Sequence, residues 1–167
     1  MDATPNQATA NSIITQHYPI YEQTKAMRDQ ILALLTDADL RFALPGANVP
    51  FGVICRELGE AQHMYIQSFQ TFTFDYTYRV DDPELETSVA KLKAWYAQLD
   101  ADLRAALEPL SEADVQGKLI DRGGFSLPVM INFQVWREAL LIFAAKSSLY
   151  LKAIERPVPQ QVQMWIG

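Results

Sequence analysis

"FQTFTFDYTYRVDD", residues 69–82, decides how the helices of this chain can be arranged. From residue 72 to residue 79 aromatic side chains alternate with Thr, Asp and Arg at a period of two, which predicts an extended segment. The apolar residues on either side recur at helical spacing instead. An extended link of this length can run the whole length of a helical bundle, so we expect the helices before and after it to be parallel.

Two helices are predicted before the link. The first covers about 19–36, because apolar residues recur there at spacings of three and four behind a proline that suits a first helical turn. Its inward stripe is Ile20, Thr24, Met27, Ile31 and Leu34. The second begins at Pro50 or Phe51 and runs through "GVICRELGEAQHMYIQSF" to about residue 69.

Two further helices are predicted after the link. Asp82-Pro83-Glu84 combines an N-cap residue, a proline and an acid, as the start of a helix requires, and the apolar seam continues to Leu103. The last helix runs from about 128 to 154, where Pro157 prevents its continuation. It is apolar over more than one stripe, so it must contact several neighbours or a second subunit.

The two corners of the chain have similar sequences. "LTDADL", residues 35–40, and "LSEADV", residues 110–115, each follow a long helix and precede a glycine-containing loop and a proline. This repetition predicts two helical hairpins in tandem. We therefore expect an all-α fold, a four-helix bundle of order up-down-down-up with an extended crossover between helices 2 and 3. One domain would cover 1–167, with 1–17 as an N-terminal extension and 155–167 as a C-terminal tail.

Composition excludes several classes of protein. Fourteen Lys and Arg against twenty Asp and Glu give a net charge of −6, and no basic cluster is present, so nucleic acid is not an expected partner. No apolar run reaches the ~18 residues of a membrane span, and no signal-peptide pattern is visible, so we expect a cytoplasmic protein without membrane contact. Cys55 is the single cysteine, which excludes an internal disulfide and predicts a buried, unreactive thiol.

Catalytic motifs are scarce. Glu60-Ala61-Gln62-His63 has the Glu-x-x-His pattern of di-iron bundles, but such a site needs the pattern twice, and the only other histidine is His17. No phosphate-binding loop or nucleophile elbow is present, and two histidines leave little for acid–base catalysis. The aromatic residues of the link and of the last helix are predicted to cover the core, with a ligand pocket as the alternative: Phe72, Phe74, Tyr76, Tyr78 and Trp136.

The tandem helix pairs, the crossover, the "LTDADL" and "LSEADV" corners, "FGVICRELGEAQHMYIQSF" and the closing "YLKAIERPVPQQVQMWIG" together resemble the DinB-like superfamily. The resemblance extends from about residue 18 to 167. It implies a divalent metal, often zinc or nickel, bound by one histidine of helix 2 and a His-x-x-x-His pair of helix 4, with chemistry such as thiol-dependent transfer.

In this chain the ligands of that metal are missing. The resemblance places Glu57 at the histidine position of helix 2, and no histidine follows His63. On helix 4 three registers are open: Phe133 with Arg137, Arg137 with Leu141, or Ala139 with Phe143. Two of them put Arg137 at a ligand position, which suggests an ion pair with Glu57 in place of the metal; alternatively, Arg137 reaches solvent and pairs with nothing.

The resemblance thus implies a metal-free, small-molecule-binding or stress-associated homodimer with a degenerate metal site at Glu57, Phe133 and Arg137. The alternative is an enzyme, a bacillithiol- or mycothiol-type transferase or hydrolase, with zinc or nickel bound by the substitute ligands Glu57, Glu60 and His63. A purely structural or partner-binding dimer is a third possibility.

Overall fold

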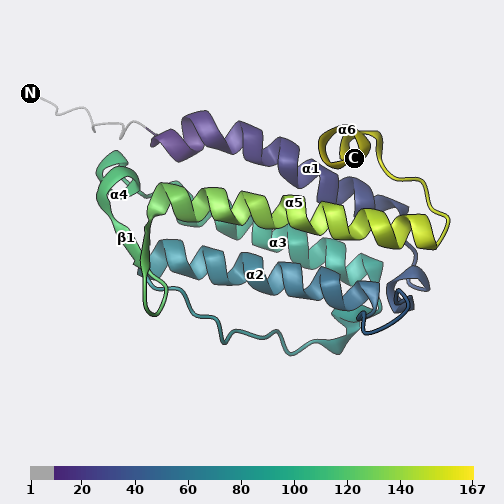
Figure 1. The fold of residues 1–167 in the computed structure, drawn as a ribbon. Helices are drawn as coiled ribbons and strands as arrows, with labels where there is room; N and C mark the ends of the chain where they lie inside the picture. The colour runs from purple at the N-terminus through teal and green to yellow at the C-terminus, as the bar shows by residue number, and fades with distance from the viewer. Residues whose placement is uncertain (1–9) are drawn as a thin grey trace, which may run out of the picture.

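The computed structural model describes residues 10–167, and this part of the chain is mostly helical, as predicted (Figure 1). Its α-helices are α1 (Tyr18–Leu34), α2 (Phe51–Thr71), α3 (Val89–Leu107), α4 (Glu112–Gly117), α5 (Val129–Ala153) and α6 (Gln160–Ile166). A short antiparallel hairpin, β1 (Leu119–Asp121) with β2 (Ser126–Pro128), was not predicted.

The four long helices α1, α2, α3 and α5 lie side by side (Figure 1). α2 packs on α3 and α5, while α1 packs on α5 and meets α3. The core between them is filled by large side chains that water does not reach, as burial of apolar surface requires. Among the largest are Tyr21, Phe51, Phe69, Tyr96, Phe133 and Trp136.

The crossover consists of residues 72–82, which lack regular secondary structure. They run back along α2, so α2 and α3 start at the same end of the molecule (Figure 1). Two glycines of α2 allow its neighbours to come close. A Cβ atom on Gly52 would lie 1.9 Å from the carbonyl oxygen of Glu86, and one on Gly59 would lie 2.2 Å from the ring of Trp95. Side chains at these two positions would therefore push the segment around α3 away from α2.

The start of the first helix differs from the prediction. A π-helical turn, Ile13–His17, precedes α1, so helical structure begins before residue 19. Asn11 is buried and donates hydrogen bonds to the carbonyl oxygens of Leu107 (2.9 Å) and Leu110 (2.8 Å), and Ile13 is fully buried. The predicted extension 1–17 is therefore too long, because residues 11–17 pack on the core. Its first nine residues lie outside the described part. On α1 itself, Ile20 is exposed although it was predicted to point inward.

The third helix starts later than predicted. Asp82 does cap a helical turn, but it is only the 3-10 turn Pro83–Glu86. α3 begins at Val89, where the hydroxyl of Ser88 accepts a hydrogen bond from the backbone of Lys91. Asp82 and Ser88 are both capping residues, and each begins a helical segment. The segment after Ser88 is the long helix.

The last part of the chain contains more structure than predicted. The corner 110–115 forms α4, which opens with a capping box made by Ser111 and Asp114. Gly123 and Gly124 turn the hairpin with positive φ angles of 72° and 127°. α5 agrees with the predicted 128–154, whereas the predicted C-terminal tail folds into α6. Within the described residues, no helix combines the length and apolarity that a membrane span needs.

Candidate functional site

The groove between α2 and α5 contains the predicted site residue Glu57. Two shallow hollows of about 260 and 150 Å³ lie there, and both are lined by Ile54, Glu57 and Lys146. The larger one also has apolar walls from Leu44, Val49, Leu149 and Tyr150. The smaller one includes Ala139, Ile142 and Phe143. Glu57 is exposed and forms no ion pair within residues 10–167.

The direction of the helices decides which residues face Glu57. Phe51 stacks on Tyr150 (4.8 Å between ring centroids) and Phe69 lies near Phe133 (6.4 Å), so α2 and α5 are antiparallel. Glu57 consequently lies opposite Ala139 and Phe143, which corresponds to the third of the three registers.

The predicted ion pair between Glu57 and Arg137 is wrong. Arg137 is half-buried and absent from the lining of the groove, and its Nε has no hydrogen-bond partner within the described residues. The other two candidates on the predicted last helix, which is α5 in the structure, are core residues. Phe133 lies 5.6 Å from the ring of Tyr21, and Trp136 is completely buried beside Tyr65. Trp136 is thus a core residue, as predicted, and does not line the groove, which was the alternative.

Glu60 and His63 hold the crossover in place. The carboxylate of Glu60 is almost fully buried, accepts a hydrogen bond from the backbone N–H of Val80 (3.0 Å) and forms an ion pair with Arg56 Nη1 (2.6 Å). One turn further, the ring of His63 stacks on Tyr78 at 3.7 Å with an interplanar angle of 16°. Burial lowers the pKa of His63, so the neutral ring is favoured there. The i, i+3 spacing thus lets both side chains contact the same neighbouring segment.

The aromatic residues of the crossover do not share one face. Phe74 is buried against Tyr65 (4.9 Å) and covers the core as predicted, but Tyr76 is 49% exposed. Phe72 is half-buried at the left-handed end of α2. The alternation fails because a turn intervenes at Tyr76, where Asp75 accepts hydrogen bonds from the backbone and hydroxyl of Thr77.

Arg122 of the hairpin also holds the crossover in place, and no pattern in the sequence predicts this contact. Its Nε donates to the hydroxyl of Tyr76 (2.9 Å), its Nη1 donates to Asn132 (2.6 Å), and the guanidinium lies 4.1 Å from the ring of Phe74. Asn132 in turn donates to the hydroxyl of Ser68 (3.0 Å). Arg122 therefore joins the crossover to α5, and through Asn132 to the end of α2.

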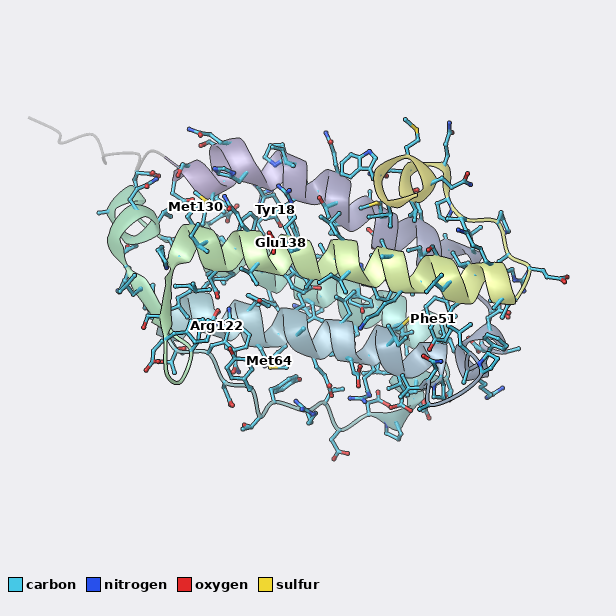
Figure 2. The ribbon with its side chains drawn as sticks, in the orientation of Figure 1. Tyr18, Phe51, Met64, Arg122, Met130 and Glu138 are labelled. Carbon is cyan, nitrogen blue, oxygen red and sulfur yellow. The ribbon has the colours of Figure 1, made fainter. Side chains whose placement is uncertain are left out.

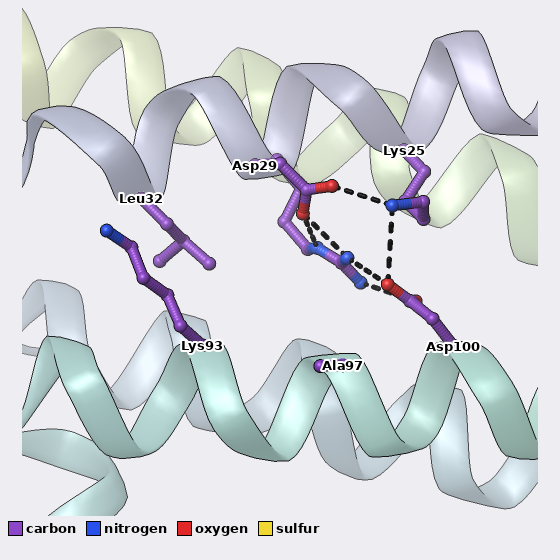
Figure 3. Close-up of a pocket in the computed structure, with 7 residues that line it drawn as sticks. Lys25, Asp29, Leu32, Lys93, Ala97 and Asp100 are labelled. Carbon is purple, nitrogen blue, oxygen red and sulfur yellow. Dashed lines mark hydrogen bonds and ion pairs between the residues drawn. The ribbon is translucent and has the colours of Figure 1, made fainter.

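A buried ion pair lies between α1 and α3, where sequence reasoning placed no charge (Figure 3). Arg28 is 1% exposed and makes a bidentate contact with Asp100, at 2.7 and 3.1 Å. Asp29 and Gln62 accept its remaining hydrogen bonds, and its guanidinium lies 4.2 Å from the ring of Tyr96. The pair faces a cleft of about 280 Å³, lined also by Lys25, Leu32, Lys93 and Ala97.

The electrostatics of this pair favour its charged form. Burial alone would raise the pKa of Asp100, but the hydrogen bonds and the charge of Arg28 outweigh burial and hold that pKa below its usual range. All donors of Arg28 have acceptors, so the cluster stabilises α1 against α3. The sequence did indicate that Arg28 faces inward, because it lies four residues after Thr24 and three before Ile31 on the predicted inward stripe.

The metal site implied by the resemblance does not fit these residues. Within residues 10–167 no group of three or more His, Cys, Asp and Glu could hold a metal ion. The proposed substitutes do not converge either, because Glu57 faces the α5 groove whereas Glu60 and His63 contact the crossover. Cys55 is fully buried, as predicted, and burial raises the pKa of its thiol.

Comparison with known proteins adds no relative: the chain matches no protein-family model, no curated protein and no solved structure.

Proposed function

We propose that this chain is a cytoplasmic DinB-like protein, a four-helix bundle of order up-down-down-up, that binds a small molecule in the α2–α5 groove without a metal and acts as a homodimer. One observation carries the proposal. The groove brings Glu57 next to Ala139 and Phe143, the positions at which one of the three registers of the resemblance would place metal ligands, and offers a carboxylate instead of imidazoles.

The chemistry of the groove indicates the class of ligand. Its walls combine apolar side chains such as Ile54 with the polar side chains of Glu57 and Lys146, and Glu57 is an exposed carboxylate without an ion pair within the described residues. A molecule with an apolar body and an amine or guanidinium group satisfies both features, because the cation can pair with Glu57 while the body covers Ile54 and Val49. The groove has no arrangement of nucleophile and base, so binding rather than catalysis is proposed.

The alternative of a metal-dependent thiol transferase is not proposed. Oε1 of Glu60 already accepts a hydrogen bond from Val80 and forms an ion pair with Arg56, so this carboxylate serves the attachment of the crossover. His63 is stacked on Tyr78 on the same side, away from Glu57. A tetrahedral site needs three protein ligands directed at one point, and these side chains are not so directed.

A thermal-shift experiment with phenethylamine and 3-phenylpropionate tests the proposal. Both probes have the same apolar body, but only the amine can pair with Glu57. A ligand that binds the folded state raises the melting temperature, so phenethylamine should raise it more than 3-phenylpropionate does. Glu57→Gln should remove this difference, whereas Glu22→Gln, an exposed acid of α1 outside the groove, should preserve it. Equal shifts for the two probes on the wild-type protein would contradict the proposal.

A further inference from the structure

An apolar stripe on α5 has no partner in the described chain. Residues recur along it at alternating spacings of four and three, the pattern by which one helix packs along another. We call it the α5 stripe; it consists of Ile131, Val135, Ile142, Ala145 and Leu149, with the exposed Glu138 at the position between Val135 and Ile142. Ile131 is 40% exposed, and Ile142 and Leu149 are each 57% exposed. Figure 1 shows α5 in front of α3, with no element crossing the side that faces the viewer.

The α5 stripe is complementary to itself in the antiparallel direction. Val135 and Leu149 lie seven positions to either side of Ile142, so an antiparallel copy centred there would set apolar residues against each other. Glu138 and Lys146 lie four positions to either side of Ile142, so the same register would set each acid against a base. Chains related by a two-fold axis require such a pattern, because residue i must fit residue j and residue j must fit residue i.

The charges at these positions are free to pair across an interface. Glu138, labelled on α5 in Figure 2, and Lys146 are exposed, and neither forms a hydrogen bond or ion pair within residues 10–167. Exposed carboxylates and ammonium groups flanking an apolar centre match the usual composition of an interface, with an apolar core and a polar rim.

We infer that two copies of this chain associate through antiparallel α5 helices, with a two-fold axis at Ile142 and Glu138 paired with the partner's Lys146. The inference rests on the homodimer of the proposed function and names its interface. Ile142 and Lys146 also line the smaller hollow beside Glu57, so the second copy closes the outer side of the binding groove.

Sedimentation of the purified protein over a range of concentrations tests whether the apolar residues around Ile142 form the interface. The wild-type chain should be a dimer, and Ile142→Glu should shift it to monomer, because two like charges would meet at the axis. Met164→Glu is the matched control, since Met164 is 75% exposed on α6, away from the stripe. This control should remain dimeric.

Charge reversal tests the register. Glu138→Lys or Lys146→Glu alone should weaken the dimer about tenfold or more, because each sets like charges together twice in a symmetric interface. The double variant should restore the wild-type dissociation constant to within about threefold, since every pair is again opposite in sign. Two equally weakened singles without restoration would overturn the register.

The outcomes separate this inference from the proposed function. A monomeric wild-type chain contradicts both the homodimer and its interface. A dimer that Ile142→Glu and both reversals leave unchanged contradicts the α5 interface alone. Small-molecule binding is measured independently, through the phenethylamine shift of the wild-type chain and of Glu57→Gln.

Discussion

Arg28 and Arg137 are both arginines on largely buried helices, but their surroundings differ. Arg28 is buried with a bidentate carboxylate and two further acceptors, so its desolvation is offset. Arg137 is half-buried without an ion pair among the described residues. The sequence makes Arg137 the more conspicuous of the two because its helix is so apolar, yet the buried pair forms on α1.

Asp100→Asn tests the energetic role of this pair. The substitution keeps the size of the side chain but leaves Arg28 with Asp29 as its only acid, so the free energy of unfolding should fall by about 3 kcal/mol. Urea denaturation measures the loss. Asp102→Asn, at a half-buried position of the same helix whose side chain accepts a hydrogen bond only from Gln98 among the described residues, should change stability by less than about 0.5 kcal/mol. Equal losses for the two variants would show that Arg28 does not depend on Asp100.

The pH dependence of stability follows from the same carboxylate. The pKa of Asp100 in the folded chain lies below its usual value, so the unfolded chain binds the proton more readily. The stabilisation is therefore complete above the ordinary aspartate pKa of about 3.9 and is lost as pH falls through the lower folded value. The gap in unfolding free energy between wild type and Asp100→Asn should be constant from pH 7 to 5 and shrink in more acidic buffer. A gap that widens on acidification would be the contrary result.

At the scale of elements, apolar periodicity predicted the long helices well. α2 and α5 begin and end within about two residues of their expected limits, because each starts after a proline and follows a clear stripe. The start of α3 was predicted too early since Asp82 and Ser88 are both suitable caps, and sequence alone does not say which one opens the longer helix. The hairpin was missed because each strand has only three residues.

Glu60→Ala tests how the crossover is attached to α2. Without the carboxylate, the N–H of Val80 loses its acceptor, and the amide should exchange with solvent deuterium about tenfold faster or more. Hydrogen exchange followed by mass spectrometry of peptides from 72–82 gives the measurement. Glu57→Ala, on the same helix but facing the groove, should leave these peptides unchanged. An unchanged exchange rate at Val80 in Glu60→Ala would show that Glu60 does not attach the crossover to α2.

At the scale of the molecule, the candidate site was only partly predictable. The resemblance pointed to Glu57, which does line a groove. The residues of α5 that face Glu57, however, depend on the position of α5 along the axis of α2. Moving from Arg137 to Phe143 is a shift of six residues, or about 9 Å along the helix axis. Such a shift is set by core contacts such as Phe51 with Tyr150, which no local pattern reveals.

Within residues 10–167, the α2–α5 groove contains the carboxylate of Glu57 but no histidine, whereas the metal of a DinB-like protein would need three imidazole ligands. Elemental analysis of protein purified without chelators, followed by calorimetric titration with zinc and nickel, tests this claim most directly. We predict metal well below one equivalent per chain and no tight binding of either ion. One tightly bound equivalent that Glu57→Gln abolishes would contradict the account.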